Sequence, residues 1–214
     1  MKKILIFSAG SAGREIFQLI NYINYSKKTW QVIGYVDDNL SKKFKKIDGI
    51  KIFSNANKPV NQKIYAVCGI MNPLLREKIY KNEIIKAGYT LTNLIHPKVE
   101  IPKCFSFGKG NVIFNNVHIS FEVKIGNYSI ISNFCDLGHN LFSKDLLTLM
   151  PSVIIGGNCK IGYSVFFGSG AKLMQNLKIG NNCKIGMGCT ITSDVSNHSS
   201  VLDYQRKVTK KNVQ

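Results

Sequence analysis

Apolar residues recur every six positions from Ile101 to Ile191, and fifteen of the sixteen positions in this register are large and apolar. The exception is Ser143. A second register of mostly smaller residues lies two positions away and runs from Val99 to Val195. A period of six fits neither a helix nor an isolated strand. It predicts a chain that turns a corner every six residues, so that three short strands form one coil and the coils stack as a parallel β-helix.

Half of the sixteen positions are followed by glycine, which we expect to allow backbone angles at each bend that a Cβ would forbid. The large residue fills the inside of the coil, and the smaller one fits the tighter corner. Chance alternation in an ordinary β-sandwich is the alternative. So many matches in one phase argue against it.

The residues before Pro97 have a different pattern. They predict an α/β unit of the doubly wound kind in the order β-α-β-β-β-α-β. We expect strands at 2–7, 30–35, 51–53, 64–70 and 91–95, and helices at 14–23 and 74–87. The chain therefore divides into an N-terminal Rossmann-like α/β domain, residues 1–97, and a solenoid domain, residues 98–214.

The composition limits the class of protein and the compartment to which the chain can belong. The chain has 214 residues, of which 44% are hydrophobic, enough for a substantial core. No apolar run is long enough to span a membrane, and the first strand leads into a glycine turn rather than a signal-peptide cleavage site. We expect a cytoplasmic protein without stable membrane insertion. Four of the six cysteines fall on the small inward register, which favours packing over disulfides or a metal site: Cys135, Cys159, Cys183 and Cys189.

The formal net charge is +17, with lysines spread along the chain and clustered only at 42–46 and 207–211. No basic module studded with aromatic residues is present, so nucleic acid is not an expected partner. The lysines either reflect a bias towards Lys, Ile and Asn, or attract an anionic ligand such as a nucleotide or coenzyme A.

The turn after the first strand contains part of a dinucleotide fingerprint. Ser8 replaces the first glycine of Gly-x-Gly-x-x-Gly, while Gly10 and Gly13 remain. Backbone amides at the start of the next helix could hold a phosphate. Asp37 and Asp38 end the following strand, where an acid could bind ribose hydroxyls or a base edge. The alternative is a packing turn with exposed acids, and a complete NAD site fits less well.

His139 is the candidate catalyst in the solenoid. It lies two residues past inward Leu137, so we expect it at a corner and facing outward, where an imidazole can act as a general base. Asp136 is near enough in sequence to supply a carboxylate to it. The other histidines are His96, His118 and His198, and for any single one surface exposure without a function is the alternative.

Four short stretches resemble the bacterial sugar acyltransferases of the sialic-acid O-acetyltransferase and bacillosamine-pathway N-acetyltransferase type. They are Ser8–Glu15, Tyr35–Asn39, Ala66–Gly69 with Arg76–Ile79, and Asn93–Pro97. The resemblance covers nearly the whole chain. It implies a left-handed parallel β-helix, a homotrimer with active sites between neighbouring subunits, acetyl-CoA along the solenoid and a nucleotide-linked sugar on the N-terminal domain, without a metal.

The same resemblance implies roles for individual residues. His139 would be the base, with Asn140 beside it, and Gly157 would offer its amide to the developing oxyanion. Gly157, Gly168, Ser169 and Gly186 would lie along acetyl-CoA, and the nucleotide-sugar end would include Gly10, Ser11, Gly13, Asp37, Asp38 and Gly69. The chain departs from the family pattern in four places: Ala12 replaces a histidine, Asn140 stands where relatives often carry an acid, and the stretches Gly69–Asn72 and Val201–Lys207 differ.

We therefore predict an acetyl-CoA-dependent N-acetyltransferase that acts on the amino group of a nucleotide-linked amino sugar in surface-glycan biosynthesis. An amine is preferred because neutral Asn140 gives the base only modest support. The alternatives are a sugar O-acetyltransferase and a non-catalytic solenoid that binds or scaffolds. Serine acetyltransferases are disfavoured, because their N-terminal part is helical.

Overall fold

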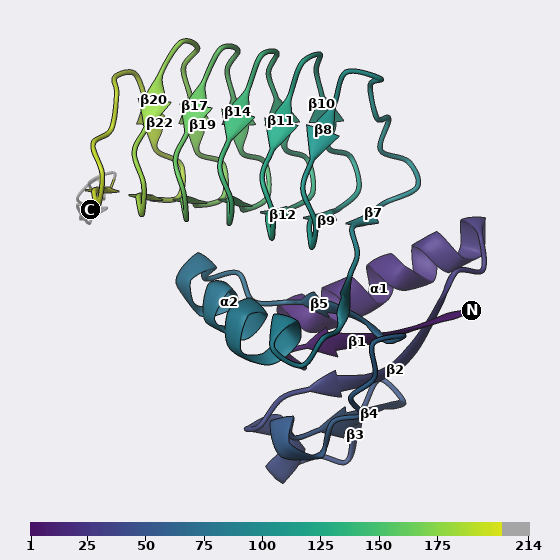
Figure 1. Cartoon of the computed structure of the whole chain (residues 1–214). Coiled ribbons are helices and arrows are strands. Elements are labelled where there is room, and N and C mark those ends of the chain that lie inside the picture. The colour runs from purple at the N-terminus through teal and green to yellow at the C-terminus, as the bar shows by residue number, and fades with distance from the viewer. Residues whose placement is uncertain (203–214) are drawn as a thin grey trace, which may run out of the picture.

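The computed structural model describes residues 1–202, which form an α/β domain and a solenoid (Figure 1). The sheet of the N-terminal domain has the order β3-β4-β2-β1-β5-β6. Its strands are β1 (Lys2–Phe7), β2 (Trp30–Val36), β3 (Lys46–Ile47), β4 (Ile50–Phe53), β5 (Tyr65–Cys68) and β6 (Thr90–Leu91). The helices are α1 (Ser11–Ser26), α2 (Pro73–Ile79), which continues as a π-helical stretch at Tyr80–Ile85, and two 3₁₀ turns at Leu40–Lys42 and Asn55–Asn57.

Strand β1 lies inside this sheet, and its side chains alternate between two apolar layers. Ile4 and Ile6 pack towards α1, whereas Leu5 and Phe7 pack on the side of Tyr80 and Ile84. Successive residues of a strand face opposite sides of its sheet, so an uninterrupted apolar run is needed where both faces are covered. The predicted doubly wound domain is confirmed.

Two details of this domain differ from the prediction. Strand β3 was missed; it pairs antiparallel with β4 across the turn at Asp48 and Gly49, whose φ angles of 52° and 74° suit an Asp-Gly hairpin. The strand expected at 91–95 is two strands. Its first part, β6, stays in the N-terminal sheet, whereas β7 (Leu94–Ile95) pairs with β9 of the solenoid.

The solenoid has three parallel sheets, which we number in the order in which each coil visits them. Sheet I contains β7, β9 (Val112–Ile113), β12 (Ile130–Ile131), β15 (Thr148–Leu149), β18 (Phe166–Phe167), β21 (Lys184–Ile185) and β23 (Ser200–Val201). Sheet II contains β10 (His118–Ile119), β13 (Asp136–Leu137), β16 (Ile154–Ile155), β19 (Lys172–Leu173) and β22 (Thr190–Ile191). Sheet III contains β8 (Ser106–Phe107), β11 (Lys124–Ile125), β14 (Phe142–Ser143), β17 (Lys160–Ile161) and β20 (Lys178–Ile179).

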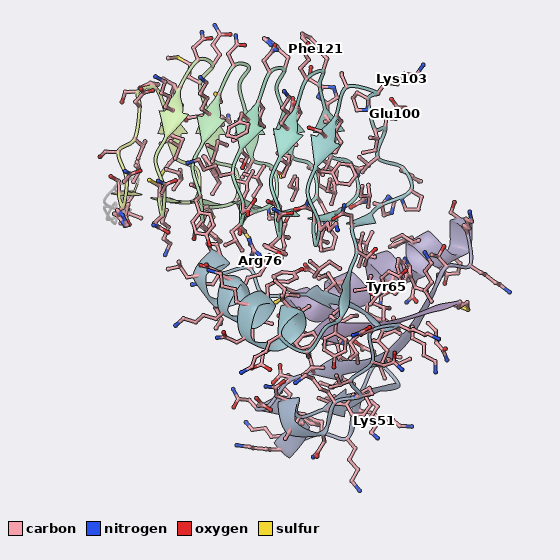
Figure 2. The ribbon with its side chains drawn as sticks, viewed as in Figure 1. Lys51, Tyr65, Arg76, Glu100, Lys103 and Phe121 are labelled. Carbon is pink, nitrogen blue, oxygen red and sulfur yellow. The ribbon has the colours of Figure 1, made fainter. Side chains whose placement is uncertain are left out.

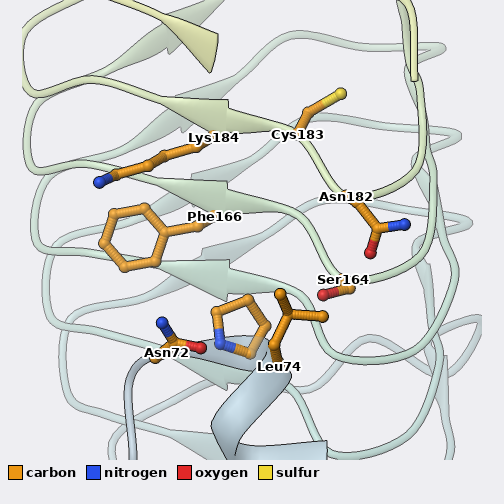
Figure 3. Close-up of a pocket in the computed structure, with 8 residues that line it drawn as sticks. Asn72, Leu74, Ser164, Phe166, Asn182, Cys183 and Lys184 are labelled. Atoms are coloured by element: carbon orange, nitrogen blue, oxygen red, sulfur yellow. The ribbon is translucent and has the colours of Figure 1, made fainter. Parts of the chain in front are cut away.

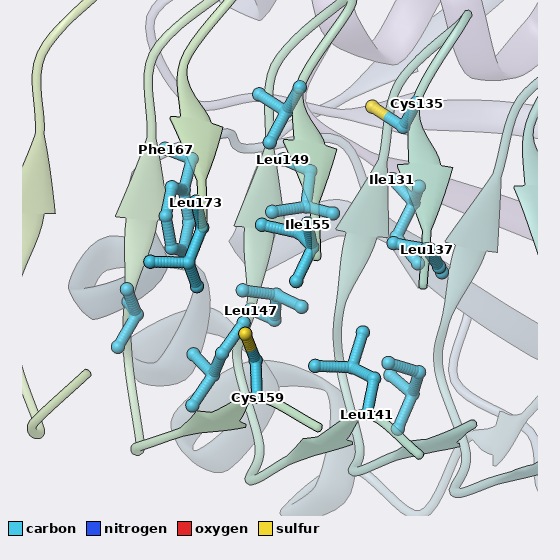
Figure 4. Close-up of a cluster of buried hydrophobic side chains, with 14 of the residues drawn as sticks. Ile131, Cys135, Leu137, Leu141, Leu147, Leu149, Ile155, Cys159, Phe167 and Leu173 are labelled. Atoms are coloured by element: carbon cyan, nitrogen blue, oxygen red, sulfur yellow. The ribbon is translucent and has the colours of Figure 1, made fainter. Parts of the chain in front are cut away.

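Each strand is two residues long, and the second residue points inwards. Leu137, Leu149, Ile155, Phe167 and Leu173 are at most 3% exposed and fill the interior (Figure 4). The second register is buried at the corners with them, including the four predicted packing cysteines. The predicted parallel β-helix with a six-residue period is confirmed.

The ends and exceptions of the register have physical explanations. Ser143 is buried, and its hydroxyl donates to the carbonyl of Lys144, which satisfies the one polar side chain of the register. Ile101 was expected inside but is 42% exposed, because the chain enters the coils regularly only at Phe107.

The expected role of the repeated glycines is wrong. The φ angles in the left-handed region belong to residues two positions further on, such as Asn140 and Asn158. Glycine is required instead because successive coils stack closely. A Cβ on Gly138 would lie 2.7 Å from the carbonyl carbon of Gly156, and one on Gly162 would lie 2.6 Å from that of Gly180.

The N-terminal domain packs against sheet I, whose outward residues Val112, Ile130 and Thr148 are buried. Arg76 lies fully buried at this joint (Figure 2). Its guanidinium donates to the carbonyls of Ile70 and Tyr128 at 2.6 and 2.8 Å and to Thr148 Oγ1 at 2.7 Å. Burial lowers the pKa of Arg76 to about 10, so the side chain stays cationic at neutral pH. These bonds orient the two domains.

Candidate functional site

The first group of predicted site residues lies at the carboxyl ends of β1, β2 and β5. Gly13 and Gly69 allow a close approach here: a Cβ on Gly13 would lie 2.0 Å from the carbonyl oxygen of Ser8, and one on Gly69 would lie 2.6 Å from the Cα of Gly13. Ser8 has a φ of 98°, and its hydroxyl accepts from the N–H of Gly10 at 3.2 Å. Gly13 and Gly69 therefore pack the turn, whereas a Cβ on Gly10 would make only an ordinary contact, 3.5 Å from Oγ of Ser8.

The two acids of this region are not equivalent. The carboxylate of Asp37 accepts from the N–H groups of Ala9, Asn39 and Leu40 at 3.0 to 3.1 Å, so it ties the glycine turn to the end of β2. Asp38 is exposed, and one of its oxygens accepts from the N–H of Asn55 at 2.7 Å. Asp38 has acceptor capacity left for a ligand, whereas Asp37 is occupied by the backbone.

A cavity of about 250 Å³ lies at the same strand ends, lined by Ser8, Asp37, Asp38, Asn39, Asn55 and Glu83 among others. At the start of α1, the N–H groups of Ser11, Ala12 and Gly13 have no acceptor within residues 1–202. Free N–H groups and the helix dipole at such a terminus suit a phosphate group.

His139 lies at the corner between sheets II and III, as expected, and is half-buried. Its ring stacks on Phe121, with centroids 5.1 Å apart and an interplanar angle of 8°. Its Nδ1 lies 2.9 Å from Oδ1 of Asn140, and Nδ2 of Asn140 donates to the carboxylate of Glu122. Glu122 was not predicted from the sequence, although it lies one coil before Asn140.

The three side chains determine one another's hydrogen-bonding roles. A carboxylate accepts hydrogen bonds, so the NH₂ group of Asn140 faces Glu122 and its oxygen faces the imidazole. Nδ1 of His139 must then carry the proton, which leaves the lone pair of Nε2 free. A free Nε2 is the atom a general base needs.

Gly157 lies directly against this imidazole. A Cβ on Gly157 would lie 2.5 Å from Nε2 of His139, so no other residue fits without moving the ring. The N–H of Gly157 has no acceptor in the described part of the chain, although the residue is buried. Buried N–H groups are rarely left unpaired, which makes this one a candidate donor to a ligand.

The expectation that Asp136 could serve His139 is wrong. Asp136 lies on β13 and points out of sheet II, where its carboxylate oxygen lies 2.8 Å from Nδ1 of His118, one coil earlier. His139 lies beyond the turn, on a different surface. The structure therefore contains two histidine pairs, His118 with Asp136 and His139 with Asn140.

Three of the four residues expected along acetyl-CoA lie at another corner, and only Gly157 lies beside His139. Gly168, Ser169 and Gly186 connect sheet I to sheet II, whereas His139 and Gly157 connect sheet II to sheet III. A Cβ on Gly168 would lie 2.6 Å from the backbone nitrogen of Met187, so this glycine is also required for coil stacking. Most of the altered tail that begins at Val201 and the lysine cluster at 207–211 lie outside the described residues.

Within one chain, the predicted site residues of the His139 corner and those of the N-terminal strand ends therefore lie far apart. Phe121, which marks the His139 corner, lies on the side of the solenoid away from the N-terminal domain (Figure 2). The strand-end residues lie around a cavity lined by residues of the N-terminal domain alone. Within one chain, the structure brings together His139, Asn140 and Gly157, and separately the strand-end residues, but not the two sets.

A further cavity, of about 270 Å³, lies between the start of α2 and sheet I (Figure 3). Asn72, Leu74, Ser164, Phe166 and Lys184 line it. Its two walls come from different domains, so no pattern along the sequence indicates it. In residues 1–202, no cluster of three His, Cys, Asp or Glu side chains could hold a metal ion. No helix there is both long and apolar enough to cross a membrane.

Two family models match this chain. Residues 3–82 match the PglD N-terminal domain, and residues 159–193 match the bacterial transferase hexapeptide (six repeats). These matches confirm the resemblance expected from the sequence. No curated protein matches the chain.

Several solved structures share the fold. The acetyltransferase domain of PglB from Neisseria gonorrhoeae FA1090, in complex with acetyl coenzyme A, is 20% identical, with a TM-score of 0.82 over 93% of this chain and 95% of that one. A mutant of perosamine N-acetyltransferase from Caulobacter crescentus, in complex with CoA and GDP-perosamine, is 18% identical, with a TM-score of 0.83 over 98% and 97%. WeeI from Acinetobacter baumannii AYE is 22% identical, with a TM-score of 0.81 over 94% and 96%.

Proposed function

Because the chain carries a PglD-type N-terminal domain ahead of transferase hexapeptide coils, we propose that it transfers the acetyl group of acetyl-CoA to the amino group of a nucleotide-linked amino sugar, in surface-glycan biosynthesis. The observation that carries the proposal is the His139 corner, where a free Nε2 lies against a buried glycine whose N–H has no acceptor within residues 1–202. The reaction takes place in the cytoplasm, where acetyl-CoA is available.

The corner supports direct transfer. Nε2 of His139 takes a proton from the sugar amine as its nitrogen attacks the thioester carbonyl. The new C–N bond gives a tetrahedral intermediate, whose oxyanion accepts from the N–H of Gly157. The C–S bond then breaks, and the imidazolium returns the proton to the CoA thiolate. No acyl-enzyme is required, and no metal takes part.

The N-terminal domain would bind the nucleotide. The free N–H groups of Ser11, Ala12 and Gly13 suit its phosphates, and Asp38 at the edge of the adjoining cavity suits ribose hydroxyls or a base edge. A Cβ on Gly10 would make no close contact, whereas Gly13, Gly69 and Asp37 act by shaping the turn.

The proposal requires more than one subunit. The His139 corner, the corner of Gly168, Ser169 and Gly186, and the nucleotide end lie on different sides of one chain, so a complete site needs a neighbouring copy. A homotrimer of triangular prisms would bring unlike corners together. Exposed apolar side chains at both corners support such contacts: Phe121, Phe134, Met174 and Met187.

Mixed trimers test the shared site. We expect light scattering to give three times the chain mass of 23.9 kDa. His139→Ala and Gly168→Trp should each be inactive alone, and refolding them together should restore part of the activity, because some interfaces combine two intact corners. A monomer, or a mixture as inactive as its parts, contradicts the shared site.

The choice between amine and hydroxyl changes with the structure. The sequence-based preference for an amine assumed that neutral Asn140 left the base without a carboxylate, but Glu122 lies on the far side of that amide. The preference now depends on the likeness in fold to a perosamine N-acetyltransferase. Transfer to a sugar hydroxyl by the same residues is the alternative.

Product analysis separates these activities. The protein is incubated with acetyl-CoA and UDP-, GDP- or dTDP-linked 4-amino sugars, and in parallel with their 4-hydroxy counterparts. We expect an alkali-stable amide on one amino sugar. An alkali-labile ester on a hydroxy sugar, with every amino sugar untouched, would establish O-acetylation. No product with any acceptor would favour a non-catalytic binding protein.

A further inference from the structure

The corner residues of the solenoid stack in a column with an 18-residue spacing. Between sheets II and III the column runs through Glu122, Asn140, Asn158 and Asn176, all with φ angles between 54° and 64°. Asparagine tolerates this left-handed conformation better than most residues do. Nδ2 of Asn158 donates to Oδ1 of Asn176 at 3.1 Å, so the amides bond along the column. Glu122 is the one carboxylate in it.

Two consecutive residues of one coil hold two consecutive residues of the next. Phe121 stacks on the ring of His139, and its carbonyl accepts from the N–H of Asn140 at 3.0 Å. The carboxylate of Glu122 accepts from the side-chain amide of Asn140. The coil that contains Glu122 therefore fixes the imidazole ring of His139, the backbone of Asn140 and the side-chain amide of Asn140.

We propose that Glu122 is a positioning residue that supplies, through the amide of Asn140, the carboxylate that Asn140 itself lacks. This inference rests on the proposed function of His139 as a base. Glu122 fixes the direction of the Asn140 amide, which in turn fixes the proton on Nδ1 of His139 and leaves Nε2 free. When Nε2 takes the proton of the amine, the negative charge stabilises the imidazolium through the polarised amide. Glu122 itself touches no substrate.

The carboxylate of Glu122 matters because the side chain of Asn140 alone does not decide which end of its amide faces His139. Oxygen and NH₂ occupy almost the same volume, so an asparagine without a partner can turn its NH₂ group towards Nδ1. Nδ1 would then be the acceptor, Nε2 would carry the proton, and the base would be blocked. A carboxylate on the far side excludes that orientation.

Exchange of the amide and the carboxylate tests this directly. Glu122→Gln removes the charge and adds a donor, so Asn140 can turn. We expect kcat to fall about tenfold, a part of the usual contribution of a general base, while KM for both substrates stays within about twofold. In the double variant Glu122→Gln/Asn140→Asp, the carboxylate introduced at position 140 accepts from His139 and from the amide introduced at position 122. This exchange variant should recover kcat to within about threefold of the parent.

The matched control is Asp136→Asn, which removes the carboxylate of the other histidine pair and should leave kcat unchanged. Glu122 and Asn140 are both exposed, so unchanged melting temperatures are expected for all three proteins. Full activity of Glu122→Gln would overturn the proposal, and so would an exchange variant no better than Glu122→Gln.

A second readout needs no substrate. In protein with ¹⁵N-labelled histidine, long-range ¹H–¹⁵N spectra report which ring nitrogen carries the proton, and the His139 signals are those missing from His139→Ala. We expect the Nδ1–H form in the parent, a mixture in Glu122→Gln, and the Nδ1–H form again in the exchange variant. An unchanged form in Glu122→Gln would refute the positioning role. A changed form in a protein that acetylates no sugar would uphold it and refute only the proposed function.

Discussion

The strand-end site of the N-terminal domain and the His139 corner of the solenoid are assembled over different distances along the chain. The N–H of Ala9 and the carboxylate of Asp37 that meet at the first site are 28 residues apart, a separation set by how a strand, a helix and another strand pack. At the second site, Glu122 and Asn140 are 18 residues apart, which is one coil. Contacts in the solenoid follow a fixed period, so neighbours can be found by counting, whereas contacts in the α/β domain depend on its topology.

The largest effect should come from the solenoid site. His139→Ala should lower kcat by roughly a hundredfold or more, the usual contribution of a general base, with little change in melting temperature because the ring lies outside the core. Steady-state kinetics and thermal melting measure the two. The control is His118→Ala, one coil away with an aspartate partner, which should keep near-normal activity. Equal losses would mean that the two histidine pairs do not differ in function.

The second largest effect is expected at the joint between the two domains, where Arg76 lies. Arg76→Met keeps much of the buried volume but leaves the carbonyls of Ile70 and Tyr128 and the Thr148 hydroxyl without their donor. We expect a loss of about 2 kcal/mol in the free energy of unfolding, the cost of buried acceptors without partners. Urea denaturation measures it. Arg14→Met, whose side chain is exposed and pairs with Asp48, should change little. A small effect of Arg76→Met would mean that the domains dock by apolar contact alone.

Substitutions at the nucleotide end should have smaller effects, which differ between Asp38 and Asp37. Asp38→Asn should raise KM for the nucleotide sugar about fivefold without changing the melting temperature or KM for acetyl-CoA, because loss of one charged hydrogen bond costs about 1 kcal/mol. Asp37→Asn should lower the melting temperature as well, since Asp37 holds three backbone N–H groups. If Asp38→Asn instead weakened acetyl-CoA, the N-terminal domain would have been assigned the wrong ligand.

The smallest effect is expected when the cysteines of the two regions are compared by chemical labelling. Burial raises the pKa of Cys68, in the N-terminal sheet, to about 12 and that of Cys135, in the solenoid, to about 11. Cys104 is exposed. A colorimetric thiol reagent at pH 8 should therefore label one cysteine rapidly in the native protein and all six in denaturant. Rapid labelling of more than one would show that a core opens easily.

Much of the fold could be predicted from patterns along the chain. Every strand of the solenoid from β8 to β22 lies in the predicted register, because a residue that points into a coil must be apolar whatever surrounds the coil. The face of the solenoid that meets the N-terminal domain is also marked in the sequence, by apolar residues at outward positions. From β9 to β18, the outward positions of sheet I are Val112, Ile130, Thr148 and Phe166, whereas lysines occupy several outward positions of sheets II and III.

The site was predicted less completely, and the misses share a cause. Asp136 was considered for His139 because the two are close in sequence, but strand residues point out of a sheet while His139 lies past the turn. Counting one coil of 18 residues back from Asn140 leads to Glu122, but the direction in which the Glu122 side chain points could not be read from the sequence.

The sequence by itself determined where each coil begins, which side chains fill it, and which histidine lies at a corner, since these depend on periodicity alone. Tertiary structure decided which side chains meet at that corner, which acid of the Asp37–Asp38 pair is free, and how Arg76 joins the domains. Those outcomes depend on the direction of each side chain and on hydrogen bonds between distant segments, which become defined only when the coils stack and the domains pack.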